Sequence, residues 1–178
     1  MGDMLEVDYE RAIAAKYPEP VALAVSMDRV ANRPNIITLG WAMCTSHSPP
    51  MLAISVGHTR HSLKNISDAG EFVLAFPSAA QAEAALFCGA SSGRDVDKFA
   101  ESGLEPLPAL KVEPPLVADA CANFECTVVD ACESGDHRIF IGRVVASHMC
   151  VPMRPRLYTL PQGDLGPVSW RGAGAVGR

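Results

Sequence analysis

The sequence lacks the long apolar runs, basic clusters and export signals that define several classes of protein. No run of about eighteen or more apolar residues occurs, so a membrane-spanning helix is not predicted. Lys and Arg total 15 against 20 Asp and Glu, and this net charge of −5 does not favour nucleic acid as a partner. The acidic N-terminus has no apolar segment typical of a secretory signal, so a cytoplasmic protein is expected.

The six cysteines include no Cys-x-x-Cys pair. Cys121 and Cys126, followed by His137 and His148, come nearest to a zinc cluster, but their spacing does not match a structural zinc site. We therefore predict no metal site and interpret the cysteines as reduced thiols.

Length and composition favour one globular domain over residues 1–178, since 48% of the residues are hydrophobic and 20% are charged. Apolar alternation and breakers predict strands at residues 21–26, 37–44, 51–56, 71–76, 123–129 and 138–147. Caps and stops predict helices at residues 9–16, 59–69, 79–87 and 96–102. His58 or Thr59 is expected to cap the second helix and Asp95 the fourth, with Gly70 and Gly103 as stops.

The remaining segments are predicted to be connections. Four prolines make residues 104–115 a long loop, and the chain beyond Val151 is expected to be extended. In the hairpin over residues 123–147, Phe124, Cys126 and Val128 should point inward and the polar residues outward. Strands at both ends with helices between them favour a closed or split β-barrel over an α/β sheet.

Residues 37–44 are the most informative predicted strand. One face carries bulky apolar side chains and the other carries Thr38, Gly40, Ala42 and Cys44. A face of small residues permits close approach of a flat ligand. Packing of that face against a helix is an equally good interpretation.

A second candidate site is the polar junction at residues 55–62, where a strand ends and a helix begins. Exposed N–H groups and the helix dipole favour anions at such a junction, and Thr59, Arg60 and Ser62 add donors. A plain helix cap with a solvated Arg60 is the alternative. The loop at residues 91–98 adds basic residues, although its own aspartates are able to neutralise them.

Other catalytic patterns are missing. The GAGAVG run at residues 172–177 has no strand, helix or acidic residue in the positions that a dinucleotide site needs. No G-x-S-x-G elbow occurs, and His137 has no Asp or Glu at a fixed triad spacing.

Four ordered stretches together resemble the flavin reductase-like, FMN-binding split-barrel family, in its flavoredoxin-like branch. They are NIITLGWAMCTSHSPPMLAISV, HTRHSLKNISDAGEFVLAF, CGASSGRDVDKF and ECTVVDACESGDHRIFIGRVVA, and the resemblance covers about residues 18–160. One departure is Ser48, which stands before the two prolines where an acid is commoner in the family.

The resemblance implies an all-β, Greek-key split barrel with short helices, a homodimer, and FMN near the dimer interface. It implies an oxidoreductase that passes electrons from NADH, NADPH or a redox partner protein through FMN to an acceptor. An electron carrier without turnover of its own, and a barrel of the same shape that binds haem or a deazaflavin, remain alternatives.

The resemblance also implies site residues. His137 and Cys44 are the candidates for chemistry. The implied FMN-binding residues are Asn35, Ile36, Thr38, Trp41, Cys44, Thr45, Ser55, Val56, Gly57, Thr59, Ser62, Ser92, Lys98 and His137.

Overall fold

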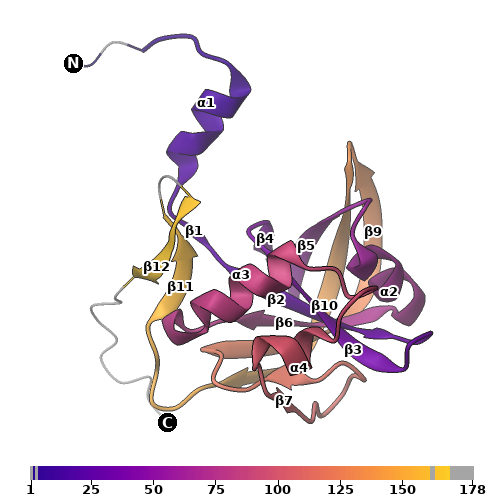
Figure 1. Ribbon diagram of the computed structural model, residues 1–178. Coiled ribbons are helices and arrows are strands. Elements are labelled where there is room, and N and C mark those ends of the chain that lie inside the picture. Colours follow the sequence, from indigo (N-terminus) through magenta and orange to yellow (C-terminus); the bar gives the residue numbers. More distant parts are fainter. Residues whose placement is uncertain (1, 3, 161–162, 169–178) are drawn as a thin grey trace.

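A large antiparallel β-sheet dominates the computed structural model, which describes residues 2, 4–160 and 163–168 (Figure 1). Its strands are β2 (Ala22–Asp28), β3 (Arg33–Leu39), β4 (Ala42–His47), β5 (Pro50–Gly57), β6 (Glu71–Phe76), β9 (Ala122–Ser134) and β10 (His137–Met149). The strand order is β3-β2-β6-β9-β10-β5-β4, so the prediction of a mainly β fold is confirmed.

The connection between β3 and β4 shows that this sheet is strongly curled. These strands lie at opposite edges, which in a flat sheet of seven strands would be roughly 29 Å apart. Only Gly40 and Trp41 separate Leu39 from Ala42, and that link reaches at most about 11 Å. The backbone N–H of Ser55 also donates to the Trp41 carbonyl at 3.0 Å, which ties the link to β5. The two edges are therefore brought close together.

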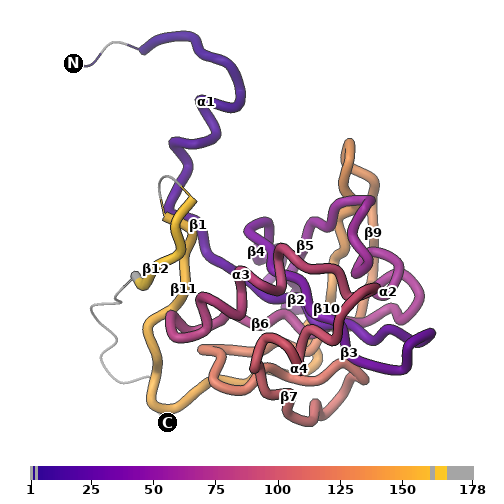
Figure 2. The backbone as a smooth tube through the Cα atoms, in the orientation of Figure 1, coloured from indigo at the N-terminus to yellow at the C-terminus, as the bar shows by residue number. Residues whose placement is uncertain are grey.

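The core lies on both sides of β2, whose alternate residues belong to two apolar clusters. Leu23 and Val25 pack on one side with α3 (Ala82–Ala90) and α4 (Lys98–Ser102), which cover that face in Figures 1 and 2. Ala22 and Ala24 lie in the other cluster with Ile66 of α2 (His61–Ala69). Burial of both faces explains why residues 21–25 form a continuous apolar run.

The predicted strand over residues 37–44 is wrong as a single element, because it breaks at Gly40 and Trp41. Its bulky face is buried only as far as Leu39, while Trp41 and Met43 are 46% and 61% exposed. On the small face, the Thr38 hydroxyl donates to the Ala85 carbonyl of α3 at 2.6 Å. Helix packing, one of the two interpretations of that face, is therefore correct for Thr38.

The predicted hairpin is confirmed as β9 and β10, but its outward face is not polar throughout. Asn123 and Glu125 are buried, contrary to expectation. Glu125 accepts hydrogen bonds from the backbone N–H groups of residues 110–112 at 2.9, 2.6 and 3.1 Å, and lies 2.7 Å from Nε2 of His148. It thus anchors the predicted loop, in which β7 (Pro106–Leu107) pairs with β8 (Leu116–Val117).

Segments near the two ends of the described chain pair in a small separate sheet. Its order is β1 (Glu19–Pro20), β11 (Arg156–Thr159) and β12 (Leu165–Val168), so the part of the tail predicted to be extended contains two strands. Before β1, α1 (Tyr9–Ile13) and a 3-10 turn at Ala14–Lys16 confirm the first predicted helix. We call residues 4–18 the N-terminal arm, and Figure 1 shows it standing away from the large sheet. The GAGAVG run lies outside the described residues.

The predicted helix ends are confirmed, whereas two of the predicted caps are wrong. Gly70 and Gly103 end α2 and α4 with φ of 69° and 72°, a conformation that glycine adopts at little cost. The N-cap of α4 is Asp97, not Asp95, because the Asp97 carboxylate accepts from two N–H groups of the first turn. The N-cap of α2 is Arg60, and no side chain caps this helix. No helix of the described part is long and apolar enough to cross a membrane.

Candidate flavin site

A polar cavity of about 110 Å³ lies between the N-terminus of α2 and the loop that follows α3. We call it the anion cavity. Its lining residues are Asn35, Ile37, Thr59, Arg60, His61, Ser62, Gly89, Ser91, Ser92, Gly93, Arg94 and Lys98.

The anion cavity is lined by basic side chains and by no acidic one. Lys98 is buried, and its ammonium donates to the Cys88 carbonyl at 2.7 Å. Burial lowers the pKa of Lys98, and the like charge of Arg60 adds to that shift, although Cys88 opposes it. A cationic group that is costly to keep charged favours an anionic ligand, because the ligand restores the charge balance.

His61 is held at the cavity wall by the last residue of β2, which is acidic. Its Nε2 lies 2.7 Å from Oδ2 of Asp28, and both side chains are largely buried. The backbone N–H of Ala31, together with His61 and the N–H of Val30, lowers the pKa of Asp28 although burial opposes them. The ionised Asp28 therefore fixes the orientation of the His61 ring at the cavity wall.

Asn35 and Gly93 form the closest contact in the cavity. The Asn35 amide nitrogen donates to the Ser62 hydroxyl at 2.7 Å, while its Oδ1 is buried with no partner among the described residues. A Cβ added at Gly93 would lie 1.9 Å from that oxygen, so only glycine fits there. An orphaned buried acceptor in a cavity indicates that a ligand with a hydroxyl or N–H donor belongs beside it.

The N-terminus of α2 opens onto the same cavity. Residues 59–62 line it, and no side chain caps the helix. The N–H groups of Arg60 and Leu63 donate to the carbonyls of Gly57 and Arg60, whereas those of His61 and Ser62 have no partner among the described residues. The interpretation of residues 55–62 as an anion site therefore has a geometric basis. The alternative of a plain helix end with a solvated Arg60 stays open, because Arg60 occupies the N-cap position and is exposed.

A second cavity of about 170 Å³ adjoins the first, and we call it the ring cavity. The two share Ile37 and Arg60 in their walls. The ring cavity is lined by Ile37, Thr38, Leu39, Gly40, Trp41, Ser55, Gly57, Arg60 and His137.

Two ring systems stand together in the ring cavity wall. The rings of Trp41 and His137 have centroids 4.8 Å apart at an interplanar angle of 40°. Nδ1 of His137 lies 2.6 Å from Oδ1 of Asp136, and this bond is the main reason for the lowered pKa of Asp136. The acidic partner of His137 is thus its direct neighbour, which a search for triad spacing does not detect.

The predicted site residues divide into three groups. Ten line the two cavities: Asn35, Thr59, Ser62, Ser92 and Lys98 the anion cavity, and Thr38, Trp41, Ser55, Gly57 and His137 the ring cavity. Ile36 and Val56 do not, because their side chains are fully buried in the two core clusters. Cys44 and Thr45 are exposed on β4 and line neither cavity.

Nine lining residues are missing from that prediction, and the four whose chemistry the site uses are Arg60, His61, Gly93 and Arg94. Arg60 and Arg94 occur in the polar segments that the sequence singled out, so their charge was a usable signal. His61 and Gly93 lie in the same segments, but their particular roles could not be predicted because they depend on Asp28 and Asn35, which lie far from them in the chain. Within the described residues, no group of three or more His, Cys, Asp or Glu side chains is placed to hold a metal ion.

The chain belongs to the flavin reductase like domain family, whose model matches residues 14–161. That match includes every lining residue of the anion and ring cavities. The resemblance found in the sequence motifs is therefore confirmed.

Three relatives illustrate the family. An uncharacterized protein of Archaeoglobus fulgidus is 33% identical over 129 residues, covering 72% of this chain and 71% of the relative. A flavin reductase (NADH) of Kitasatospora aureofaciens is 32% identical over 62% of this chain and 56% of its own length. The structure of flavoredoxin of Desulfovibrio vulgaris (Miyazaki F) is 26% identical with a TM-score of 0.82, covering 99% and 98% of the two chains.

Proposed function

We propose that this protein is an FMN-dependent oxidoreductase that holds the FMN phosphate in the anion cavity and the isoalloxazine in the ring cavity. The observation that carries the proposal is the pairing of the two cavities. One is polar and cationic, the other contains an aromatic pair, and they meet at Arg60 and Ile37. FMN has the same division, with a dianionic phosphate joined to a flat ring by a polyhydroxyl chain.

The residues present fit this cofactor in their hydrogen-bonding chemistry. The open N-terminus of α2, with Arg60, Arg94 and Lys98, provides N–H donors and charge for a phosphate. The unpartnered Oδ1 of Asn35 is an acceptor, which suits a hydroxyl of the ribityl chain and not the phosphate. Any side chain at position 93 would collide with that oxygen, and glycine avoids this collision.

The protein residues position the ring and exclude competing orientations. When bound, FMN supplies hydride and single-electron chemistry. Trp41 and His137 provide a wall on which a flat ring packs, and the ionised Asp136 fixes the orientation of the His137 ring. Cys44, predicted to touch the ring, is exposed and three residues beyond Trp41, so we assign it no role in the chemistry.

We further propose that the curled sheet is a split barrel and that the protein is a cytoplasmic homodimer. The two-residue link between β3 and β4 supports the barrel. All six cysteines are free, in keeping with a reducing compartment. Exposed apolar side chains on β9 and β10, among them Val129, Val145 and Met149, support association with a second copy. Sedimentation equilibrium tests the dimer, and a particle of one 18.9 kDa chain at all concentrations would refute it.

The test of the function is the absorbance of the purified protein before and after addition of FMN, followed by anaerobic NADH or NADPH. Flavin bands that bleach with one nicotinamide support the oxidoreductase and identify its donor. Bands that bleach only with a chemical reductant indicate a carrier supplied by a redox partner protein. Absence of flavin bands and of FMN binding would refute the proposal, and haem or deazaflavin would then be titrated.

A further inference from the structure

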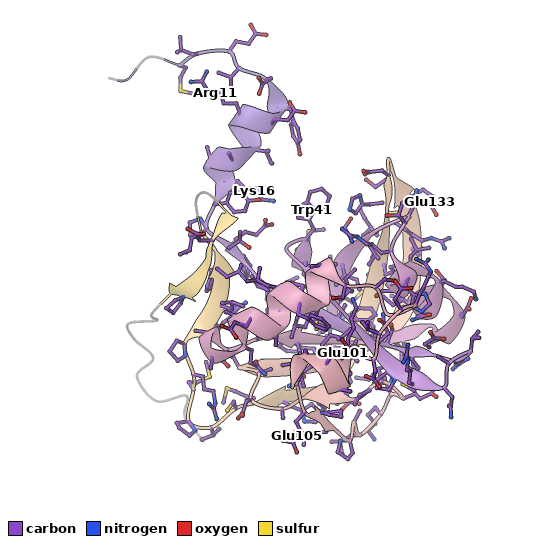
Figure 3. All side chains as sticks on the ribbon, viewed as in Figure 1. Arg11, Lys16, Trp41, Glu101, Glu105 and Glu133 are labelled. Atoms are coloured by element: carbon purple, nitrogen blue, oxygen red, sulfur yellow. The ribbon has the colours of Figure 1, made fainter. Side chains whose placement is uncertain are left out.

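A third cavity, of about 320 Å³, lies between the N-terminal arm and the body of the protein. We call it the arm cavity. Tyr9, Ile13 and Lys16 of the arm form one wall, and Trp41, Met43 and Ile139 belong to the opposite one. Lys16 lies close to Trp41 in Figure 3, with its ammonium 5.7 Å from the centre of the indole ring.

The arm cavity is a neighbour of the ring cavity. Both are lined by Trp41 and Ser55, so a molecule in the arm cavity would lie next to the proposed position of the isoalloxazine. The opposite wall comes from β4, β5 and β10, which belong to the large sheet, whereas the arm alone contributes the outer wall.

The chemistry of the arm cavity differs from that of the anion cavity. Its two charged lining residues, Lys16 and Glu19, form an ion pair of 2.8 Å and neutralise each other. Glu19 lies against the body, since its Oε2 is 3.2 Å from the position of a Cβ at Gly40. The other lining residues are apolar or aromatic apart from Ser55. A charged ligand would have to break the ion pair or lose its water without compensation.

We infer that the arm cavity is a binding site for a small, uncharged, planar aromatic molecule. Its volume is at the low end of the range of roughly 300–1,000 Å³ found for ligand pockets, which limits the ligand to one or two fused rings. Trp41 and Tyr9 provide ring surfaces for packing. Binding itself requires no cofactor, and only the role of the occupant, as a substrate placed beside the flavin, rests on the proposed function.

Quenching of Trp41 fluorescence by 1-nitronaphthalene tests this site. The chain has two tryptophans, so a Trp170→Phe background leaves Trp41 as the reporter. We expect saturable quenching, weakened about fivefold or more by Ile13→Asn on the arm and by Met43→Asn on the body. Leu5→Asn is the matched control, because Leu5 is an exposed arm residue that does not line the cavity. A charged analogue, naphthalene-1-sulfonate, should bind more weakly than the uncharged probe.

Two further readouts separate the possible failures. FMN affinity, measured by flavin fluorescence, should be the same in Ile13→Asn and Leu5→Asn. If neither the wild-type protein nor any variant binds FMN, the proposed function is refuted, but the arm cavity as a ligand site is not. Quenching that rises linearly with the concentration of 1-nitronaphthalene, without saturation, would refute the arm cavity as a ligand site. Equal affinities of Ile13→Asn and Leu5→Asn for this probe would refute it as well. Absence of probe binding, combined with a lower sedimentation mass for Ile13→Asn, would refute it in favour of a second copy of the chain as the occupant.

Discussion

At the scale of single residues, Arg60 lies where the anion cavity meets the ring cavity. Arg60→Ala should weaken FMN binding by about 5- to 30-fold, since a hydrogen bond to a charged group contributes roughly 1–2 kcal/mol at an exposed site. Riboflavin lacks the phosphate, so its affinity should not change. Isothermal titration with both ligands measures the difference. Arg29→Ala, which removes an exposed arginine outside the cavities, is the control. An equal loss for FMN and riboflavin would show that Arg60 does not contact the phosphate.

Lys98 makes FMN binding depend on pH. Its pKa is lowered from 10.5 by burial and by the like charge of Arg60, so it loses its proton at a lower pH than an exposed lysine. The phosphate binds the protonated form better, and FMN affinity should therefore fall as the pH rises through this lowered pKa. Lys98→Met should remove this dependence and weaken binding at neutral pH. Lys64→Met, which removes a lysine paired with Asp68 on the surface of α2, should leave the profile unchanged. A flat wild-type profile up to pH 10 would contradict the assignment.

Glu125 is the strongest structural prediction at this scale. Burial alone would raise its pKa, but the N–H groups of Leu110, Lys111 and Val112 and the ring of His148 outweigh it, so its pKa is lowered from 4.5. The stability from these bonds is therefore present above pH 4.5 and is lost as the pH falls below it. Glu125→Gln should destabilise the fold by roughly 3 kcal/mol at neutral pH, because a buried multiple acceptor loses its charge. Urea unfolding at several pH values measures both effects.

The exposed Glu113 provides the comparison for Glu125. Among the described residues its side chain reaches Arg29 alone, at 3.4 Å, so Glu113→Gln should change the free energy of unfolding by less than about 0.5 kcal/mol. A similarly small change for Glu125→Gln would show that the carboxylate does not hold the loop.

The residues that the sequence brought into one cavity are those whose chemistry is local. Thr59 and Ser62 lie in a segment whose composition indicated an anion site, Lys98 was implied by the resemblance, and all three line the anion cavity. His61 depends on Asp28, and Asn35 on Gly93, and these pairings come from strands and loops that are distant in the sequence. Burial of Glu125 likewise depends on the loop at residues 110–112, which is distant in the sequence. The alternation of apolar and polar residues in the hairpin therefore predicted wrongly that Glu125 points outward.

At the scale of elements, the break between β3 and β4 shows the limit of periodicity. The alternation of Ile37, Leu39, Trp41 and Met43 continues through the break, because exposed apolar residues follow buried ones without a change of pattern. What interrupts the strand is the curl of the sheet, which directs β4 to pair with β5 at the far edge. Hairpins and glycine stops were predictable because they depend on residues that are close in sequence.

The loop between α3 and α4 gives the prediction at this scale. A Cβ at Gly93 would meet Asn35 Oδ1 at 1.9 Å, so Gly93→Ala must displace either the loop or Asn35. We expect FMN affinity to fall at least tenfold, measured by flavin fluorescence. Gly70→Ala is the matched control: the φ of 69° makes alanine cost about 1 kcal/mol there, but no atom lies near its Cβ, and FMN affinity should stay unchanged. Equal FMN affinities in the two variants would contradict the position proposed for the ligand.

At the scale of the whole molecule, the flavin site joins parts of the chain that the sheet brings together. Arg60 comes from the start of α2, Trp41 from the β3–β4 link, and His137 from the first residue of β10. A ligand that touches all of them stabilises the folded state against global unfolding, since the unfolded chain keeps none of these contacts.

Saturating FMN should therefore raise the midpoint of thermal unfolding. At a free concentration 100 times the Kd, binding adds about 2.7 kcal/mol, which for a chain of this length corresponds to roughly 5–11 °C. Riboflavin at the same concentration should give a smaller shift, because it lacks the phosphate that the anion cavity holds. Arg60→Ala should reduce the FMN shift toward the riboflavin value, whereas Arg29→Ala should keep it, and differential scanning calorimetry measures all four. Equal shifts for FMN and riboflavin in the wild-type protein would mean that the anion cavity holds no phosphate, even if the ring cavity binds the flavin.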